Sequence, residues 1–259
     1  MSSGRFLVES SGKVAIIRID DAPTRNSISM AMADELRDHL RACGKTARAI
    51  VLTGSGQAFC SGANLGSLTP DDFEGRDAGA ALEAHINPLM QAVRDLHVPL
   101  VTAVRGAAAG VGASLALAGD IIVAGRSAYF LQAFCHIGLL PDGGSPWLLT
   151  KAIGRVRAME LMMLGEKLHA ERAYEWGMVT RLVPDEEVQS EALALARRLA
   201  DGPTVALGLI RAAGWAAAES TFTQELELER QLQRQAGAHP VFKEGVMAFL
   251  QKRPASFGD

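Results

Sequence analysis

The chain has 259 residues, of which 48% are hydrophobic and 21% charged, and it carries a formal net charge of −3 with a pI of about 6.1. This composition is ordinary for a globular protein, and the length allows one large domain or two small ones. No run of Lys or Arg is longer than two residues. We therefore expect no binding to nucleic acid and no attraction to an anionic membrane surface.

The cysteines and the N-terminal residues indicate a cellular compartment. Cys43, Cys60 and Cys135 form no Cys-x-x-Cys pair, and the six histidines are dispersed. This pattern favours a reducing compartment, with no disulfide framework and no metal site. The N-terminus lacks the apolar core of a signal peptide, and glycines and Asp120 interrupt the apolar stretch 106–124. We therefore expect a cytoplasmic protein without a membrane span.

The first half of the chain alternates between strand-like and helix-like segments. Two apolar runs separated by Ser-Gly predict a hairpin, and the next segment has apolar residues at a spacing of four behind a possible cap, Ser27 or Ser29. The predicted strands are 5–10, 13–20, 48–54, 99–104 and 120–125, and the predicted helices are 27–43, 80–96 and 108–118. Alternation of this kind indicates an α/β fold with a mostly parallel sheet.

The second half of the chain is predicted to be mainly helical. A helix is expected to start near Ser145, and six further segments have helical patterns: 154–165, 169–177, 185–202, 203–220, 221–237 and 240–253. Only residues 178–183, "MVTRLV", have the pattern of another strand. We therefore divide the chain into an α/β core, residues 1–190, and a helical C-terminal region, residues 191–259.

Two segments, 52–66 and 104–120, contain glycines and other small residues where a strand gives way to a loop or helix. Small residues allow close approach of a ligand or of another backbone, and the N–H groups at a helix start lack partners within the helix. Two such starts facing one point would form an oxyanion hole made of main-chain donors. Tight packing of helices on the sheet selects the same residues, so this pattern alone leaves both interpretations open.

Several ordered stretches resemble one family. They are "RAIVLTGSGQAFCSGANL", "VTAVRGAAAGVGASLALAGDIIVA", "GLLPDGGSPWLL", "AMELMMLGEKLHAERAYEWGMVTRLVP" and "GVMAFLQKR". Together they are similar to the signature stretches of the crotonase (enoyl-CoA hydratase/isomerase) superfamily, from the first hairpin to Arg253. The resemblance implies a crotonase (ClpP/crotonase-like) spiral of ββα units and a C-terminal helical region that forms a trimer or a dimer of trimers.

The resemblance also implies site residues. The two oxyanion donors correspond to the backbone N–H groups of Ala63 and Val111, which would hold the thioester oxygen of an acyl-CoA. The positions implied to contact CoA are Arg25, Ser61, Ala63, Asn64, Leu65, Val111, Phe249 and Lys252. Phe249 and Lys252 would reach CoA from a neighbouring subunit in many family members. No cofactor is implied beyond the CoA that is part of the substrate, and no metal.

The chain departs from the hydratases of the family at two positions. Ser114 and Phe134 stand where hydratases carry their two glutamates, and neither can act as an acid–base carboxylate. Asp142, between Pro141 and two glycines, could be a turn residue or a helix cap. The stretch 129–149 nevertheless resembles the phenylacetate-pathway isomerases that convert ring-epoxide phenylacetyl-CoA to oxepin-CoA, and in isomerase-type members this position is the catalytic aspartate.

We therefore predict an acyl-CoA isomerase in which Asp142 moves the proton and its pKa is raised by apolar neighbours. The neighbours expected to do this are Phe134, Leu139, Leu140 and Trp147. The alternatives are an enoyl-CoA hydratase-like lyase or hydrolase, and a CoA-thioester-binding protein with little turnover. His85 and His136 are interpreted as structural, and Asp72 and Glu74 as solvated loop acids. The sequence does not specify the acyl group.

Overall fold

The computed structural model describes residues 5–64, 66 and 77–258. Its larger sheet has six strands in the order β1-β2-β3-β5-β7-β10. The hairpin β1–β2 is antiparallel, with Phe6 opposite Ile19, and the neighbouring pairs from β2 to β10 are parallel. The strands are β1 (Phe6–Ser11), β2 (Val14–Ile19), β3 (Ala49–Gly54), β5 (Leu100–Val104), β7 (Ile121–Gly125) and β10 (Arg181–Val183). The predicted hairpin and parallel sheet are confirmed.

A second sheet continues from the carboxyl ends of these strands. It has four strands of three residues each, in the order β4-β6-β8-β9: β4 (Ala58–Cys60), β6 (Ala107–Ala109), β8 (Tyr129–Leu131) and β9 (Lys167–His169). None of the four was predicted. The helix expected from residue 108 begins at Val111, because β6 occupies the preceding residues. The prediction that 178–183 holds the only strand of the second half is wrong, because β9 also lies in that half. Three-residue strands are too short to produce an alternating pattern.

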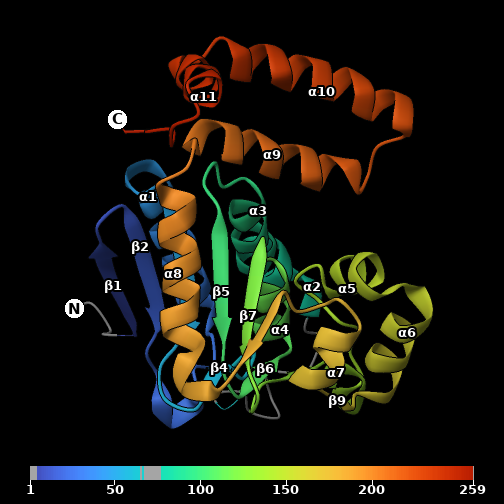
Figure 1. Ribbon diagram of the computed structural model, residues 1–259. Helices are drawn as coiled ribbons and strands as arrows, with labels where there is room; N and C mark the ends of the chain where they lie inside the picture. The colour runs from blue at the N-terminus through green and yellow to red at the C-terminus, as the bar shows by residue number, and fades with distance from the viewer. Residues whose placement is uncertain (1–4, 65, 67–76, 259) are drawn as a thin grey trace.

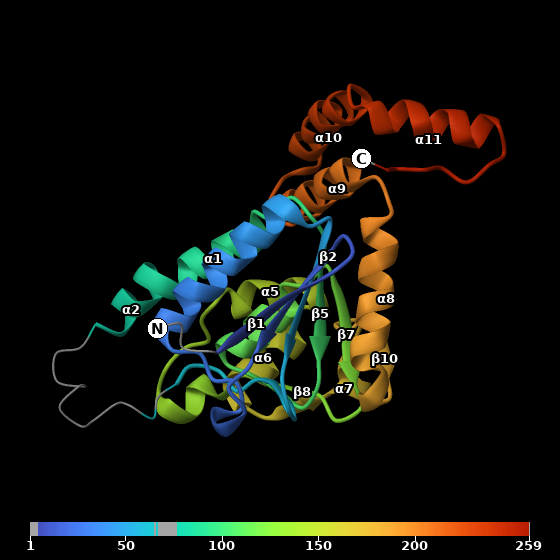
Figure 2. The same ribbon diagram turned by 90° about the vertical axis from the view of Figure 1, so that its left-hand side faces the viewer.

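Helices cover both faces of the larger sheet (Figure 2). On one face lies α1 (Met30–Thr46), which begins where the Ser29 side chain accepts a hydrogen bond from the Met32 N–H. Beside α1 runs a helix made of α2 (Ala78–Ala81), a π-helical turn (Leu82–Ile86) and α3 (Asn87–Arg94). On the other face, α8 (Val188–Ala200) buries its alanines against β3, β5 and β7.

Shorter helices surround the second sheet. They are α4 (Val111–Leu117), α5 (Ser145–Ile153), α6 (Arg155–Leu164) and α7 (Ala170–Glu175), with 3₁₀ turns at Ala22–Thr24, Ala133–Ile137 and Asp185–Glu187. Every residue of α4 is buried, which its small side chains permit. The expected start of α5 near Ser145 is confirmed.

The C-terminal helices α9 (Thr204–Ala217), α10 (Phe222–Gly237) and α11 (Pro240–Leu250) form a layer across one end of the larger sheet (Figure 1). Residues just before three parallel strands hold α9: Arg48 donates to the Gly202 carbonyl at 2.7 Å, Gly208 packs on the His97 carbonyl, and Arg211 bonds Asp120 at 2.8 Å. The layer therefore lies at the amino ends of β3, β5 and β7. The division proposed at residue 190 stays a prediction, and that residue lies inside α8.

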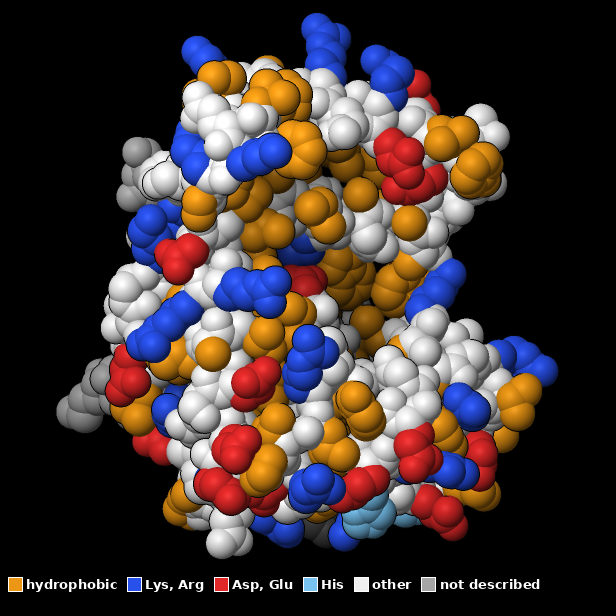
Figure 3. Space-filling model, viewed as in Figure 1, with side chains coloured by type: hydrophobic (Ala, Val, Ile, Leu, Met, Phe, Trp, Pro, Cys, Tyr) orange, Lys and Arg blue, Asp and Glu red, His pale blue; other side chains and the backbone are white. Residues whose placement is uncertain are grey.

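A groove of about 460 Å³ lies between α9 and α5, where Figure 3 shows a hollow with many hydrophobic side chains. Trp147 and Trp215 stack in it with ring centroids 5.5 Å apart. Among the described residues, no helix is long and apolar enough to cross a membrane.

Candidate active site

In the loop after β4, the backbone N–H of Ala63 points away from Ile28 and its segment. The Ile28 N–H donates to the Gly62 carbonyl at 2.8 Å, and the Asn64 N–H donates to the Ile28 carbonyl at 3.0 Å. These two bonds flank Ala63 on the side that faces Ile28. Because successive peptide groups of an extended chain point to opposite sides, the Ala63 N–H points away from Ile28. Ala63 is exposed, so this donor is accessible.

A buried amide fixes the segment that holds this loop. Asn26 is fully buried in a left-handed conformation, φ 60°, and its side chain makes three hydrogen bonds. Its Oδ1 accepts from the Asp21 N–H at 2.9 Å, while its Nδ2 donates to the Ser55 and Ala58 carbonyls at 2.9 and 2.7 Å. Three of the four hydrogen bonds that an amide side chain can make are thereby formed. Asn26 thus ties the segment before α1 to the turn between β3 and β4.

The second donor lies close to the first. Val111 is the first residue of α4, so its N–H has no acceptor within the helix. A Cβ added to Gly62 would lie 2.9 Å from the Ala109 carbonyl oxygen, and one added to Gly110 would lie 3.7 Å from the Gly62 Cα. Both glycines have positive φ, 100° and 53°. The close approach at Gly62 leaves no room for a Cβ, and the positive φ at both positions favours glycine, so these two residues allow the Ala63 and Val111 loops to come together.

Asp142 lies on a glycine turn that packs against the same helix. Gly143 has φ 60°, and a Cβ there would meet Ser114 at 2.9 Å and Val111 Cγ2 at 3.4 Å. The Asp142 carboxyl is half-buried, and its Oδ1 is buried with no hydrogen-bond partner among the described residues. Burial raises the pKa of Asp142 from 3.8 to about 6. The turn that carries this desolvated carboxylate therefore packs against the helix whose first N–H is one of the two main-chain donors.

The alternative of Asp142 as a helix cap is wrong, because the cap residue of α5 is Gly144 and no side chain caps this helix. The expected rise of the Asp142 pKa is confirmed, but two of the expected apolar neighbours are not buried around it. Leu139 is 45% exposed and Leu140 75% exposed. Trp147 stacks on Trp215 in the groove beside α9. Phe134 does approach the site, since its ring lies 3.6 Å from a Cβ built on Gly110.

The remaining predicted residues divide into two groups. Arg25, Ser61 and Asn64 lie beside the Ala63 loop: the Ser61 N–H donates to the Arg25 carbonyl, and the Arg25 side chain is exposed. Phe249 and Lys252 lie on and just after α11, in the layer at the opposite end of the sheet, and Phe249 is 82% exposed. Within one chain the structure does not bring these two to the donors. Leu65, Asp72 and Glu74 lie outside the described residues.

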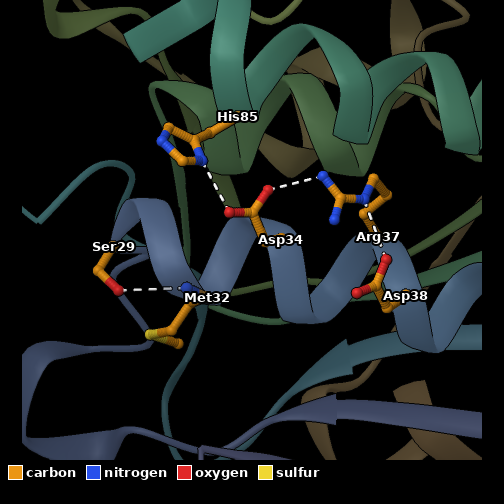
Figure 4. A network of polar contacts seen from close by, with 6 residues as sticks. All are labelled: Ser29, Met32, Asp34, Arg37, Asp38 and His85. Atoms are coloured by element: carbon orange, nitrogen blue, oxygen red, sulfur yellow. Dashed lines mark hydrogen bonds and ion pairs between the residues drawn. The ribbon is translucent and has the colours of Figure 1, made fainter.

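The two histidines interpreted as structural, His85 and His136, hydrogen-bond to residues outside the candidate site. His85 Nδ1 lies 2.8 Å from Asp34 Oδ2, and Asp34 also pairs with Arg37, so these residues join α1 to the π-helical turn (Figure 4). His136 is exposed, with Nε2 3.2 Å from the Leu164 carbonyl. Among the described residues, no three His, Cys, Asp or Glu side chains are grouped to hold a metal ion.

Comparison with known proteins identifies the family. The enoyl-CoA hydratase/isomerase family model matches residues 9–259. The chain belongs to this family. It is 45% identical to the 1,2-epoxyphenylacetyl-CoA isomerase of Escherichia coli K12 over 231 residues, which is 86% of this chain and 88% of that protein. It is 41% identical to a Rhodobacter capsulatus protein named "Probable enoyl-CoA hydratase" over 257 residues, 99% of both chains.

The fold agrees with solved structures of the family. A crystal structure of an enoyl-CoA hydratase from Polaromonas sp. JS666 superposes with a TM-score of 0.89 at 32% identity, covering 98% of this chain and 99% of that chain. The predicted crotonase fold is therefore confirmed, as is the resemblance to ring-epoxide phenylacetyl-CoA isomerases. The chain is an enzyme of the acyl-CoA hydratase/isomerase class.

Two residues of the site gave no signal in the sequence. Ser145 and Gln132 are buried behind the Asp142 turn, and their side chains are 3.0 Å apart. No short motif marks them, because they are linked to Ser114 and to each other only through the folded chain. They make the region around Asp142 a connected polar cluster.

Proposed function

We infer that this enzyme is an acyl-CoA isomerase in which Asp142 is the proton shuttle. The observation that carries this proposal is the Asp142 carboxyl itself, whose Oδ1 is buried, with no hydrogen-bond partner in the described part of the chain, on a turn packed against Val111. A carboxylate with a pKa of about 6 can both remove and return a proton near neutral pH. The Ala63 and Val111 N–H groups are the proposed oxyanion donors.

The proposed reaction needs one acid–base group. Ionised Asp142 takes a proton from the α carbon of a Δ3-enoyl thioester, and the electron pair delocalises onto the thioester oxygen. The two main-chain N–H groups stabilise that oxygen as it becomes negative. Protonated Asp142 then returns the proton to the γ carbon, which leaves a Δ2-enoyl thioester and restores the carboxylate. No water or other reagent is consumed.

The similarity to 1,2-epoxyphenylacetyl-CoA isomerase favours the aromatic variant of this chemistry, the conversion of ring-epoxide phenylacetyl-CoA to oxepin-CoA. Hydration is the weaker alternative, because Ser114 and Phe134 supply no carboxylate to activate water. Slow or absent turnover, as in a thioester-binding protein, is the other alternative. We propose no cofactor beyond the CoA of the substrate.

Binding of CoA is proposed for the residues around the first donor and for an adjacent subunit. Arg25, Ser61, Asn64 and Leu65 would contact CoA within the chain. Phe249 and Lys252 would do so only from another copy, since their layer lies at the amino ends of the strands while both donors follow the carboxyl ends. A trimer or a dimer of trimers is therefore part of the proposal.

The test compares Asp142→Asn with Asp201→Asn, a control at an exposed acid at the end of α8. We expect Asp142→Asn to remain folded, to keep its KM for 3-hexenoyl-CoA, and to lose about 10²–10⁴ in kcat for isomerisation and for α-proton exchange in deuterated water. The control should keep both activities. Undiminished turnover in Asp142→Asn rejects the mechanism, and faster hydration of crotonyl-CoA than isomerisation by the native enzyme favours the hydratase alternative.

A further inference from the structure

A buried chain of side-chain hydrogen bonds ends on the backbone of Asp142. Gln132 Nε2 lies 3.0 Å from Ser145 Oγ, Ser145 Oγ lies 2.6 Å from Ser114 Oγ, and Ser114 Oγ lies 3.0 Å from the Asp142 carbonyl oxygen. Gln132 is 3% exposed, and Ser114 and Ser145 are fully buried. Three different segments of the chain, after β8, in α4 and at the start of α5, therefore meet behind the turn.

The groups at the two ends of this hydrogen-bonded series determine which atom donates in each bond. The amide nitrogen of Gln132 can only donate, and the carbonyl oxygen of Asp142 can only accept. The Ser114 hydroxyl has two carbonyl acceptors, Asp142 at 3.0 Å and Gly110 at 3.5 Å, and the nearer is Asp142. With Ser114 donating to Asp142, Ser145 accepts from Gln132 and donates to Ser114. Each hydroxyl in this arrangement accepts one hydrogen bond and donates one, and bonds aligned in this way strengthen one another.

The Asp142 turn depends on this support because little else fixes it. Gly143 and Gly144 both have positive φ, 60° and 78°, and glycine is the most flexible residue of the backbone. The Oδ1 of Asp142 accepts no hydrogen bond from any residue that the structure describes. Besides the Ser114 hydroxyl, the Asp142 carbonyl accepts one bond from the Ser145 N–H at 3.1 Å. The direction of the carboxylate is thus set through its own peptide group rather than through its side chain.

We propose that Ser114 and Ser145 are positioning residues, whose hydroxyls, oriented by Gln132, hold the Asp142 peptide so that its carboxylate faces the substrate. This inference rests on the proposed function of Asp142. It also gives Ser114 a specific task. In this role its hydroxyl accepts a hydrogen bond from Ser145 and donates one to Asp142, and it acts as neither a nucleophile nor a base.

Removal of the Ser114 hydroxyl should impair turnover more than binding. In Ser114→Ala we expect kcat for 3-hexenoyl-CoA isomerisation to fall about 10- to 100-fold, because small displacements of a catalytic group have effects of that order. The KM should stay within about twofold. A released carboxylate gains contact with water, so the acidic limb of the kcat profile should move to lower pH by about one unit.

Thr102→Val is the matched control. The Thr102 hydroxyl is also fully buried and donates to a carbonyl of α4, that of Ala116 at 2.8 Å, but it does not touch the turn. It should lower the melting temperature by a similar amount without moving the acidic limb of the profile. If Ser114→Ala behaves like Thr102→Val, the hydroxyl is only structural and the inference is overturned.

A second variant tests the chain as a unit and does not depend on Ser114→Ala being stable. Ser145→Ala should lower kcat and move the acidic limb in the same direction, and the double variant should lose little more than Ser114→Ala alone. Independent, multiplying losses would contradict the chain. Asp142→Asn separates the two proposals. If it is inactive while Ser114→Ala and Ser145→Ala are normal, only the positioning role fails, and if it is fully active, the proposed function fails.

Discussion

At the scale of single residues, Asp142 lowers the free energy of unfolding when it is ionised, which is the form that the proposed mechanism needs at the start of the reaction. Its pKa is raised from 3.8 to about 6 by burial, and no cation pairs with it among the described residues. Between these two values the folded chain binds more protons at this site than the unfolded chain does. The free energy of unfolding therefore falls as the pH rises from about 4 to about 6, and it stays lower above that range.

This linkage predicts that Asp142→Asn stabilises the protein above about pH 6 and not at pH 4. A rise from 3.8 to about 6 corresponds to about 3 kcal/mol, and because the carboxyl is partly exposed we expect about 1–2 kcal/mol. Urea unfolding at pH 8 should show this gain, and at pH 4, where the native carboxyl is protonated, the two proteins should match. An equal difference at both pH values would mean that the pKa of Asp142 is not raised by folding.

Sequence reasoning found the residues that local chemistry marks, and it missed those that only the fold brings together. Ala63, Val111 and Asp142 were predicted as site residues because glycines beside them, and family motifs around them, distinguish their segments. Gln132 and Ser145 are 13 positions apart, and Ser114 and Ser145 are 31 apart. Contacts over such separations leave no local pattern. The exposure of Leu139 and Leu140 was missed for the same reason.

At the scale of the elements, the close packing of turns on α4 determines which substitutions the site tolerates. Gly143 and Gly138 lie in the same connection and both have positive φ, 60° and 71°. A Cβ at Gly143 would come within 2.9 Å of Ser114, whereas one at Gly138 would meet no atom within 4 Å. The two positions therefore separate backbone strain from steric contact.

We predict that Gly138→Ala costs about 1 kcal/mol, from the left-handed conformation alone. Gly143→Ala should cost about 2–4 kcal/mol, because it adds overpacking against α4, and it should also lower kcat. Chemical unfolding and isomerisation assays on both variants measure the difference. Equal losses of stability, with normal turnover in Gly143→Ala, would show that the turn does not press on Ser114.

Most of the elements that sequence patterns predicted are long enough to carry a period, and the three-residue strand β10 was predicted as part of the longer run 178–183. The hairpin, the parallel strands of the larger sheet and the long helices α1, α8 and α10 all correspond to predicted segments. The three-residue strands β4, β6, β8 and β9 do not. They form because a neighbouring strand supplies hydrogen bonds, parallel as β6 does for β8 or antiparallel as β8 does for β9, and such short segments without that neighbour would have no reason to be extended.

At the scale of the whole molecule, one buried arginine joins the C-terminal layer to the sheet. Arg211 of α9 is 6% exposed, pairs with Asp120, and donates to the carbonyls of Val93 and Leu96 at the end of α3. Burial raises the pKa of Asp120, and the neighbouring guanidinium opposes that rise. The layer is thus fixed to the sheet by polar contacts.

Exposed apolar side chains on α10 and α11 predict the assembly. Large apolar side chains stand exposed there: Phe222, Leu226, Phe242, Val246, Met247, Phe249 and Leu250, with Phe249 at 82% and Phe242 at 57%. Exposed apolar surface of this extent indicates contact with another protein surface. It agrees with a trimer or a dimer of trimers, in which this layer reaches the acyl-CoA site of a neighbouring copy.

Two charges placed on this face should therefore disrupt both assembly and substrate binding. By light scattering at micromolar concentration, we expect the native protein to have the mass of three or six chains of 27.5 kDa, and Phe242→Glu/Phe249→Glu to have a lower mass. Because Phe249 and Lys252 would contact CoA only across the interface, the variant should also show a raised KM while its helices remain folded. Leu7→Glu, at an exposed apolar residue of the edge strand β1, is the control and should change neither quantity. A native protein that is monomeric at this concentration, yet binds acyl-CoA with unchanged affinity in the double variant, would contradict the shared site, and the exposed face would then need another partner.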